Sequence, residues 1–137
     1  ITKTALKALG LTNGASHAEY KITKDGRIAI MEIGGRMGGD FIGSDLVRLS
    51  TGYDFVKGVI DVALGEFEEP VKTLNMCSGV YFLCKETEHL KTIIENWEEN
   101  PSFMEGEITD TELRVVTCSA DRSGYVIYQS ETKYRLE

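Results

Sequence analysis

Glu19 and Glu32 are the residues of this chain whose types and spacing are best suited to chemistry. They stand on either side of Asp25-Gly26, a dipeptide typical of a two-residue type I′ turn between antiparallel strands. With that turn, directly opposed residues have numbers that sum to 51, so Glu19 faces Glu32. Their Cβ atoms would lie about 5 Å apart, and like charges at that separation destabilise the pair. The repulsion must be relieved.

Three kinds of group could relieve the repulsion between the two carboxylates: a shared proton, a nearby cation or a bound divalent metal. Mg²⁺ binds carboxylate oxygens together with substrate phosphates, so a metal here would indicate phosphoryl chemistry. The alternative is that both side chains turn apart into water, as carboxylates on a surface hairpin can.

The hydrophobic pattern of the hairpin agrees with this register. A slip of one residue would turn the apolar side chains of one strand to the wrong face. In the predicted register the apolar residues of both strands share one face: Ala18, Tyr20, Ile22, Ala29, Met31 and Ile33. Strand alternation places His17 and Lys21 on the glutamate face. A structural histidine and a lysine extended into solvent are the alternatives to functional roles for these two.

A glycine-rich segment with one arginine directly follows the second glutamate: Gly34-Gly35-Arg36-Met37-Gly38-Gly39-Asp40. Glycines let the backbone approach a ligand closely, and their N–H groups can surround an anion. Arginine makes fork-like contacts with carboxylate or phosphate oxygens. Together with the two carboxylates, the segment indicates a site that handles phosphoryl groups. The alternative is an ordinary loop between a strand and a helix, with an exposed arginine.

The composition is that of a globular protein with one domain of ordinary size or two small lobes. The chain has 137 residues, of which 42% are hydrophobic and 27% charged. A formal net charge of −7 without clustered Lys and Arg argues against nucleic acid as a partner. No apolar run approaches about 18 residues and no signal-peptide pattern is present, so we expect a cytoplasmic protein with no membrane partner.

The cysteines predict no disulfide framework and no zinc site. Cys77, Cys84 and Cys118 are odd in number and widely spaced, and the chain has only two histidines. Reduced, mostly buried thiols are the better interpretation.

The first expected element is a helix over residues 1–9, where apolar residues recur at helical spacing and Gly10 follows as a stop signal. The chain opens on this pattern with Ile1, without a methionine or a leader. We therefore expect it to be part of a longer protein.

Two further helices are expected after the glycine-rich segment. Ser44 as N-cap, with Asp45 in the first turn, predicts a short helix that ends at residues 51–52. Asp54 can cap a longer helix, which Gly65 would end. Its apolar side chains repeat at helical spacing and are expected in the core: Val56, Val59, Ile60, Ala63 and Leu64.

Short β-like runs dominate beyond the acidic segment 65–70, which predicts one domain over residues 1–68 and another over 69–137. Strands are expected over three ranges: 79–84, 113–118 and 124–128. Residues 90–97 have a helical period, although their β-branched centre leaves a strand as the alternative. The expected fold class is α+β.

The segments just described resemble the C-terminal part of an ATP-grasp enzyme of the carboxylate–amine ligase type, near the carbamoyl phosphate synthase-like and amino acid ligase branches. The likeness is carried by residues 9–14, 17–19, 31–40 and 46–54. The rest of the chain is only loosely similar to that family. The resemblance implies the C-terminal half of an ATP-grasp domain, an antiparallel sheet with flanking helices, followed by a small β-rich lobe.

By this resemblance, Glu19 would bind one Mg²⁺ and Glu32 would bridge two, while Arg36 would steady the transferred phosphoryl group or the acyl phosphate. The resemblance also implies a substrate and phosphate loop, to which we assign Gly38, Gly39, Asp40 and His17. One departure is Gly34, where many members of the family carry an asparagine that is a further metal ligand. The second metal site would therefore be weaker or more hydrated.

The reaction that the resemblance implies is Mg²⁺-dependent activation of a carboxylate by ATP as an acyl phosphate, followed by attack of an amine. One or two Mg²⁺ ions, ATP, and small-molecule carboxylate and amine substrates are the expected cofactors and partners. A carbamoyl phosphate or bicarbonate-using variant of the reaction stays open. The expected partners also include the N-terminal lobes of the same protein, without which this fragment should be inactive, and a homodimer is a candidate assembly. The alternative function is a non-catalytic ATP-grasp-like module for assembly or dimerisation.

Overall fold

The computed structural model of the chain describes residues 1–136 and divides into two compact units. The first unit comprises residues 1–48 and 53–71, and the second comprises residues 49–52 with the chain from residue 72 onward. The domain boundary predicted between residues 68 and 69 stays a prediction. None of the described helices is long and apolar enough to cross a membrane.

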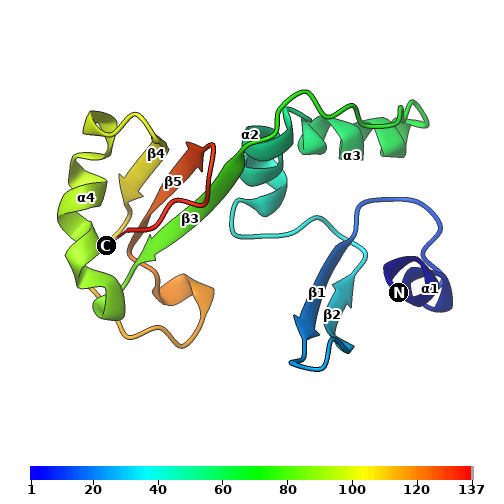
Figure 1. Ribbon diagram of the computed structural model, residues 1–137, viewed down its shortest axis with the longest axis horizontal. Helices are drawn as coiled ribbons and strands as arrows, with labels where there is room; N and C mark the ends of the chain where they lie inside the picture. Colours follow the sequence, from blue (N-terminus) through cyan, green and yellow to red (C-terminus); the bar gives the residue numbers. More distant parts are fainter. Residues whose placement is uncertain (137) are drawn as a thin grey trace. The chain divides into compact units, whose positions relative to one another are not determined.

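The first unit is built around one hairpin and short helices (Figure 1). Its elements, with α2 shared between the units, are α1 Thr2–Ala8, β1 His17–Ile22, β2 Ile28–Gly34, the π-helix η1 Ile42–Leu46, α2 Val47–Thr51 and α3 Phe55–Leu64. Helix α1 ends as predicted, because Gly10 takes the left-handed conformation with φ 74°. The Gly10 N–H donates to the Lys7 carbonyl and the Leu11 N–H to the Leu6 carbonyl, both at 3.0 Å, so the last carbonyls of the helix are satisfied.

The hairpin confirms the pairing of Glu19 with Glu32 but not the predicted turn. The Thr23 N–H donates to the Arg27 carbonyl and the Gly26 N–H to the Thr23 carbonyl, both at 2.9 Å, so three residues form the loop. Gly26 has φ 80°, the left-handed position that this type of loop requires. Near the turn, Tyr20 therefore pairs with Ile30 and not with Met31.

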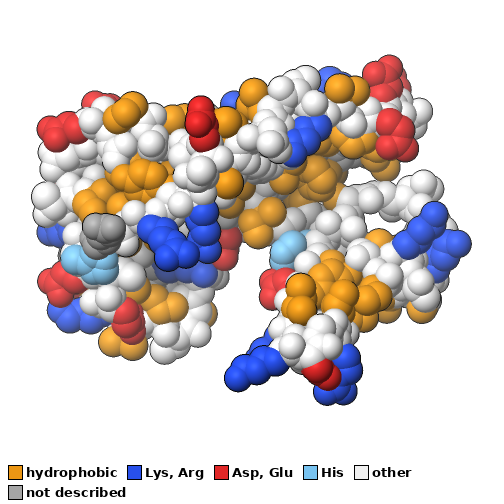
Figure 2. All heavy atoms as spheres, in the orientation of Figure 1, with side chains coloured by type: hydrophobic (Ala, Val, Ile, Leu, Met, Phe, Trp, Pro, Cys, Tyr) orange, Lys and Arg blue, Asp and Glu red, His pale blue; other side chains and the backbone are white. Residues whose placement is uncertain are grey.

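A β-bulge between Glu19 and Tyr20 then restores the predicted register, so that Glu19 pairs with Glu32 and Ala18 with Ile33. Met31 is the extra residue of the bulge. The apolar face of the hairpin tip consequently carries Ile30 and Ile28 in place of Met31 and Ala29. Figure 2 shows hydrophobic side chains gathered over the hairpin, and 49% of Ile30 and of Ile28 is exposed.

The first helical segment after the glycine-rich segment begins earlier than predicted. Helical structure starts at Ile42, within η1, and Ser44 lies inside that π-helix, where its hydroxyl donates to the Asp45 carboxylate at 2.5 Å. Ser44 is therefore not an N-cap. The stop signal at Gly52 is confirmed, since Gly52 has φ 77°.

Helix α3 has the predicted ends but buries a different face. Asp54 caps it by accepting a hydrogen bond from the Lys57 N–H at 2.9 Å, and Gly65 ends it with φ 77°. The buried residue of α3 is Gly58, which packs so closely on the Tyr53 side chain that a Cβ there would collide with the ring. The face of α3 that carries Gly58 is therefore the face that packs against the rest of the unit. Most of the stripe predicted to be core is therefore exposed, and the prediction was wrong for Val56, Ile60, Ala63 and Leu64.

The second unit is a three-stranded antiparallel sheet in the order β3-β5-β4, with α4 along one side (Figure 1). Its elements are β3 Cys77–Leu83, the 3-10 helix η2 Lys85–Leu90, α4 Lys91–Glu95, η3 Trp97–Glu99, β4 Phe103–Ile108, η4 Ser119–Asp121 and β5 Gly124–Ser130. The buried core cluster joins sheet and helices: Leu83, Leu90, Ile94, Phe103, Val126 and Tyr128. Residues 90–97 are mostly helical, as their period predicted.

The strand predicted over residues 113–118 does not form, and β4 takes its place in the sheet. The Asp121 carboxylate accepts hydrogen bonds from the N–H groups of Thr117 and Cys118 at 2.8 and 2.9 Å. These backbone donors are thus engaged locally rather than in a strand ladder. In β4, Gly106 lets the Trp97 ring lie against the backbone, because a Cβ there would be 2.7 Å from the ring.

The cysteines carry free thiols, as predicted, but they are less buried than expected. Cys84 is buried, Cys77 is half-buried and Cys118 is exposed. Cys118 is exposed because it begins the short η4 turn rather than lying in the predicted strand.

Replacing Asp121 with asparagine should destabilise the protein at pH 7 but have little effect below pH 2. Hydrogen bonds from the Thr117 hydroxyl and from the backbone of Thr117 and Cys118 lower the pKa of Asp121 from 3.8 to about 2. A carboxyl whose pKa is lower in the folded state stabilises the fold above its unfolded pKa, and this contribution is lost as the pH falls through its folded pKa. Urea unfolding of both proteins across this range measures the difference. Equal stability at pH 7 would contradict the role given to this carboxylate.

Candidate functional site

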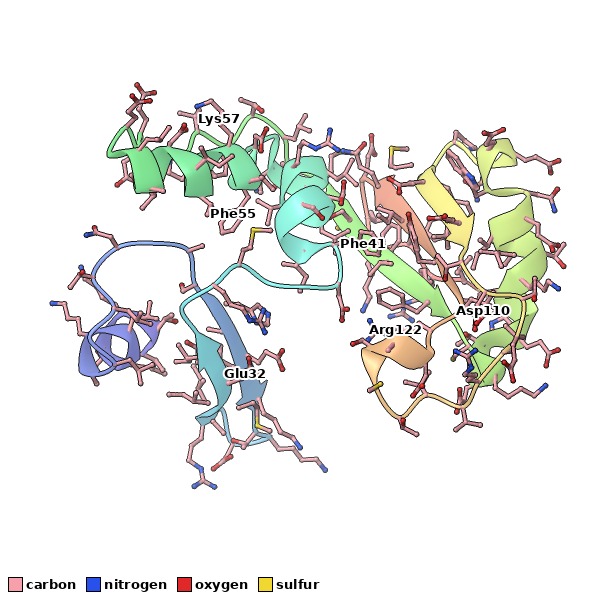
Figure 3. All side chains as sticks on the ribbon, turned by 180° about the vertical axis from the view of Figure 1, so that it is seen from behind. Glu32, Phe41, Phe55, Lys57, Asp110 and Arg122 are labelled. Carbon is pink, nitrogen blue, oxygen red and sulfur yellow. The ribbon has the colours of Figure 1, made fainter. Side chains whose placement is uncertain are left out.

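The carboxylate face of the hairpin brings together residues from both strands of the first unit. His17 and Glu19 lie two residues apart on β1, so they share one face, and Glu32 is the cross-strand partner of Glu19 on β2 (Figure 3 labels Glu32). The side chains of Glu19 and Glu32 are 57% and 54% exposed. Both carboxylates are therefore accessible to a ligand from solvent.

Arg36 lies beside the second glutamate. Its Nη2 is 3.5 Å from Glu32 Oε1, and its Nη1 donates to the Met37 carbonyl at 2.9 Å. The guanidinium is 61% exposed, and an ion pair of this kind contributes only about 0–1 kcal/mol. A weak, exposed pair can be broken or shared when an anionic ligand arrives, because the guanidinium has five N–H donors.

Gly34 opens onto the same face. A Cβ built at this position would be 3.6 Å from Arg36 Cγ and 3.9 Å from Glu32 Oε1, both ordinary van der Waals contacts. A Cβ here would therefore lie beside the Glu32 carboxylate without displacing it.

The glycine-rich loop packs directly on the hairpin. A Cβ at Gly38 would lie 3.0 Å from His17 Cδ2 and 3.1 Å from Ile42 Cβ, so the loop approaches the imidazole ring closely only because residue 38 is glycine. The space beside Gly39 is open, with no atom within 4 Å of a Cβ built there.

The loop continues through two consecutive non-glycine residues in the left-handed conformation. Asp40 has φ 52° and Phe41 has φ 63° (Figure 3 labels Phe41). Side chains of L residues make this conformation costly, and such residues often mark functional sites. The π-helix η1 follows at once, and it too is a rare element associated with such sites.

The side chain of His17 is more buried than those of Glu19, Glu32 and Arg36. Its side chain is 17% exposed, and its Nε2 lies 3.9 Å from Glu19 Oε1. Its Nδ1 is shielded from solvent and has no hydrogen-bond partner within the part of the chain that the structure describes.

The donors on this face fit a magnesium ion that also binds phosphate. Glu19 and Glu32 offer the oxygen ligands that Mg²⁺ prefers, and they are opposed in register. Residues 1–136 contain no group of three or more His, Cys, Asp or Glu side chains placed to hold a metal. Mg²⁺ commonly uses one or two carboxylates and completes its shell with water and substrate phosphates, so two carboxylates are a sufficient protein contribution.

Two structural features of the first unit were not expected from the sequence. Gly43 is buried, and a Cβ there would lie 3.2 Å from Met37 Cβ. The glycine at this position therefore lets the glycine-rich loop pack closely against η1. A cavity of about 650 Å³ lies between the loop of residues 12–16 and α3. Its helix lining is Phe55, Gly58, Val59 and Val62. The spacing of these four residues was the signal that could have indicated this face.

Comparison with known proteins bears on the fold. No protein-family profile matches the chain, and no curated protein matches it. Several chains of solved structures do. The L-amino acid ligase from Bacillus licheniformis matches with a TM-score of 0.67 and 22% identity over 93% of this chain. The phosphoribosylglycinamide synthetase from Anaerococcus prevotii matches with a TM-score of 0.63 and 23% identity over 95%. This chain has part of an ATP-grasp fold.

The chain spans about a third of the length of these two proteins, 34% and 35% respectively. The mixed α and β architecture with antiparallel sheets, expected from the ATP-grasp resemblance, is thereby confirmed. The likeness concerns the fold, so the functions of Glu19, Glu32, Arg36 and the glycine-rich loop stay predictions.

Proposed function

We propose that this chain is part of an ATP-dependent ligase that activates a carboxylate as an acyl phosphate for attack by an amine. One observation supports this most strongly: Glu19 and Glu32 are paired across the hairpin, with Arg36 beside Glu32, in an ATP-grasp fold shared with two ligases.

In this proposal Glu19 and Glu32 hold one or two Mg²⁺ ions against the phosphates of ATP. Bound Mg²⁺ supplies charge neutralisation at the transferring phosphoryl group. The two carboxylates offset the charge of the ion and fix its place on the hairpin face. Phosphoryl transfer needs alignment and electrostatic stabilisation more than a covalent side-chain nucleophile, and this face offers side chains for both tasks.

Arg36 is the residue proposed to bind the transferred phosphoryl group or the acyl phosphate. Its guanidinium is exposed and only weakly paired with Glu32, at 3.5 Å. When an anion approaches, the fork of N–H donors can bind two of its oxygens while staying close to Glu32.

The glycine-rich loop is proposed to border the carboxylate-substrate pocket. The open space beside Gly39 would let a ligand approach the backbone, whose N–H groups suit an anion. Asp40 is exposed next to this space, where a carboxylate could meet the amine substrate or repel a second anion.

The 137-residue chain alone should not catalyse the reaction, because it corresponds to only about a third of the two ligases. The test of the proposed function therefore uses the longer protein that contains this chain. ADP release should require Mg²⁺, a carboxylate and an amine together. Screening pairs of these substrates measures this, and ADP release that is independent of both substrates would contradict a ligase.

The competing function is a non-catalytic ATP-grasp-like module for assembly or dimerisation. Gly34 favours it, because the space beside Glu32 lacks the additional ligand that many ATP-grasp members place there. The two functions differ in nucleotide binding. A ligase bound to Mg·ATP at a hundred times its dissociation constant gains about 2.7 kcal/mol of stability, which raises the unfolding temperature. No rise, together with no ADP release, would favour the module.

A further inference from the structure

The imidazole of His17 is placed to act on Glu19. His17 begins β1 two residues before Glu19, and its Nε2 lies 3.9 Å from Glu19 Oε1. This separation is longer than a hydrogen bond. The Glu19 side chain is 57% exposed, so a small side-chain rotation can bring the two atoms within hydrogen-bond distance without movement of the backbone.

The imidazole ring is largely enclosed. A Cβ built at Gly38 would lie 3.0 Å from its Cδ2, which is tighter than most Cβ contacts. The side chain is only 17% exposed, in contrast to the exposed carboxylate that it approaches. His17 is therefore the fixed member of the pair and Glu19 the mobile one.

The surroundings of Nδ1 decide which nitrogen carries the proton of a neutral ring. Nδ1 is shielded and has no hydrogen-bond partner among the described residues. A proton there would be a buried N–H without an acceptor, which native structures rarely contain. A proton on Nε2 faces the Glu19 carboxylate instead. The environment thus favours the Nε2–H tautomer, with the donor aimed at Glu19.

We propose that His17 is a positioning residue that holds the Glu19 carboxylate through its Nε2–H group. The inference rests on the proposed function, in which Glu19 is a magnesium ligand. Groups that hydrogen-bond a metal ligand orient it, and their loss typically weakens metal binding by 10–100-fold. His17 would then act through Glu19 and not by contact with substrate.

The tautomer can be measured on this chain without any substrate. Nitrogen-15 NMR of histidine-labelled protein distinguishes a protonated from a bare ring nitrogen. The neutral ring of His17 should carry its proton on Nε2 alone, whereas the neutral ring of exposed His89, the other histidine of the chain, should show a mixture of both tautomers. A proton on Nδ1 of His17, or the same mixture as His89, would overturn the proposal.

The positioning effect is tested in the longer protein with three variants. In the His17→Gln variant the side-chain amide nitrogen can occupy the position of Nε2. In His17→Asn it can reach only the position of Nδ1, and His17→Ala has no hydrogen-bond donor in its side chain. We expect the Mg²⁺ concentration for half-maximal activity to rise about 10-fold or more in the Asn and Ala variants. In the Gln variant this Mg²⁺ concentration should stay within about threefold of that of the unmodified protein. The Gln and Asn variants should have similar unfolding temperatures.

If Asn works as well as Gln, or if the Mg²⁺ requirement follows the unfolding temperature in all three variants, His17 has a packing role and the proposal fails. If the unmodified protein shows no Mg·ATP-dependent activity, the ligase function itself fails. The NMR result separates the two cases, because the tautomer of His17 does not depend on activity.

Discussion

Glu32→Gln should lower the turnover of the proposed ligase, in the longer protein, by at least about 100-fold while leaving the protein folded. Loss of a single charge-stabilising group in an active site commonly costs a factor of 10²–10³ in turnover. Glutamine has the same shape but lacks the charge that a divalent ion requires, so the variant should lose magnesium binding in particular. Turnover is measured as ADP release at saturating substrates and several Mg²⁺ concentrations.

The stability of the Glu32→Gln variant should be unchanged or slightly raised. Glu32 is 54% exposed, and its substitution removes the repulsion from Glu19, a cross-strand effect of about 0.2–1 kcal/mol. A loss of turnover together with unchanged or raised stability distinguishes a functional role of Glu32 from a structural one. Glu131→Gln, at an exposed position of the second unit, is the matched control and should have normal turnover. Near-normal turnover of Glu32→Gln would refute the magnesium assignment.

The pairing of Glu19 with Glu32 was predictable from the sequence because the residues of the candidate site are close together in the chain. Glu32, Gly34 and Arg36 follow one another within five residues, and one hairpin brings Glu19 to them. The register came out right although the turn type was wrong. Thr23 selects the three-residue loop, since its hydroxyl bonds Asp25 and accepts from the Arg27 N–H. The β-bulge then offsets the one-residue shift that this loop causes. No pattern in the sequence indicates the bulge.

The elements that were missed or predicted wrongly depend on side-chain packing and strand pairing that the sequence pattern does not specify. Helix α3 has two adjacent apolar stripes, and only the packing of Tyr53 on Gly58 shows which one is inside. In β4, Glu105 and Glu107 flank Gly106, a composition with low strand preference, and pairing with β5 makes it a strand. The shielded Nδ1 of His17 likewise could not be read from the sequence.

Arg36→Ala should lower turnover by roughly 10²–10³-fold, the second large effect expected at this face. The guanidinium contributes little to the folded state, because it is 61% exposed and lies 3.5 Å from Glu32, so its removal should barely change the unfolding temperature. In ADP-release assays the loss should appear mainly in turnover rather than in the apparent affinity for ATP, since Arg36 is proposed to stabilise the group being transferred.

Two comparisons make the Arg36 prediction specific. Arg36→Lys should recover only part of the turnover, because an ammonium group keeps the charge but cannot bind two oxygens in the plane of a fork. Arg27→Ala is the matched control, because Arg27 is a more exposed arginine of the same hairpin, 82% exposed and paired with Asp25 at 2.6 Å. It should leave turnover within about twofold, since pairs this exposed contribute little. If Arg27→Ala and Arg36→Ala lose activity equally, the effect lies in the charge of the hairpin, and the role proposed for Arg36 would have to be abandoned.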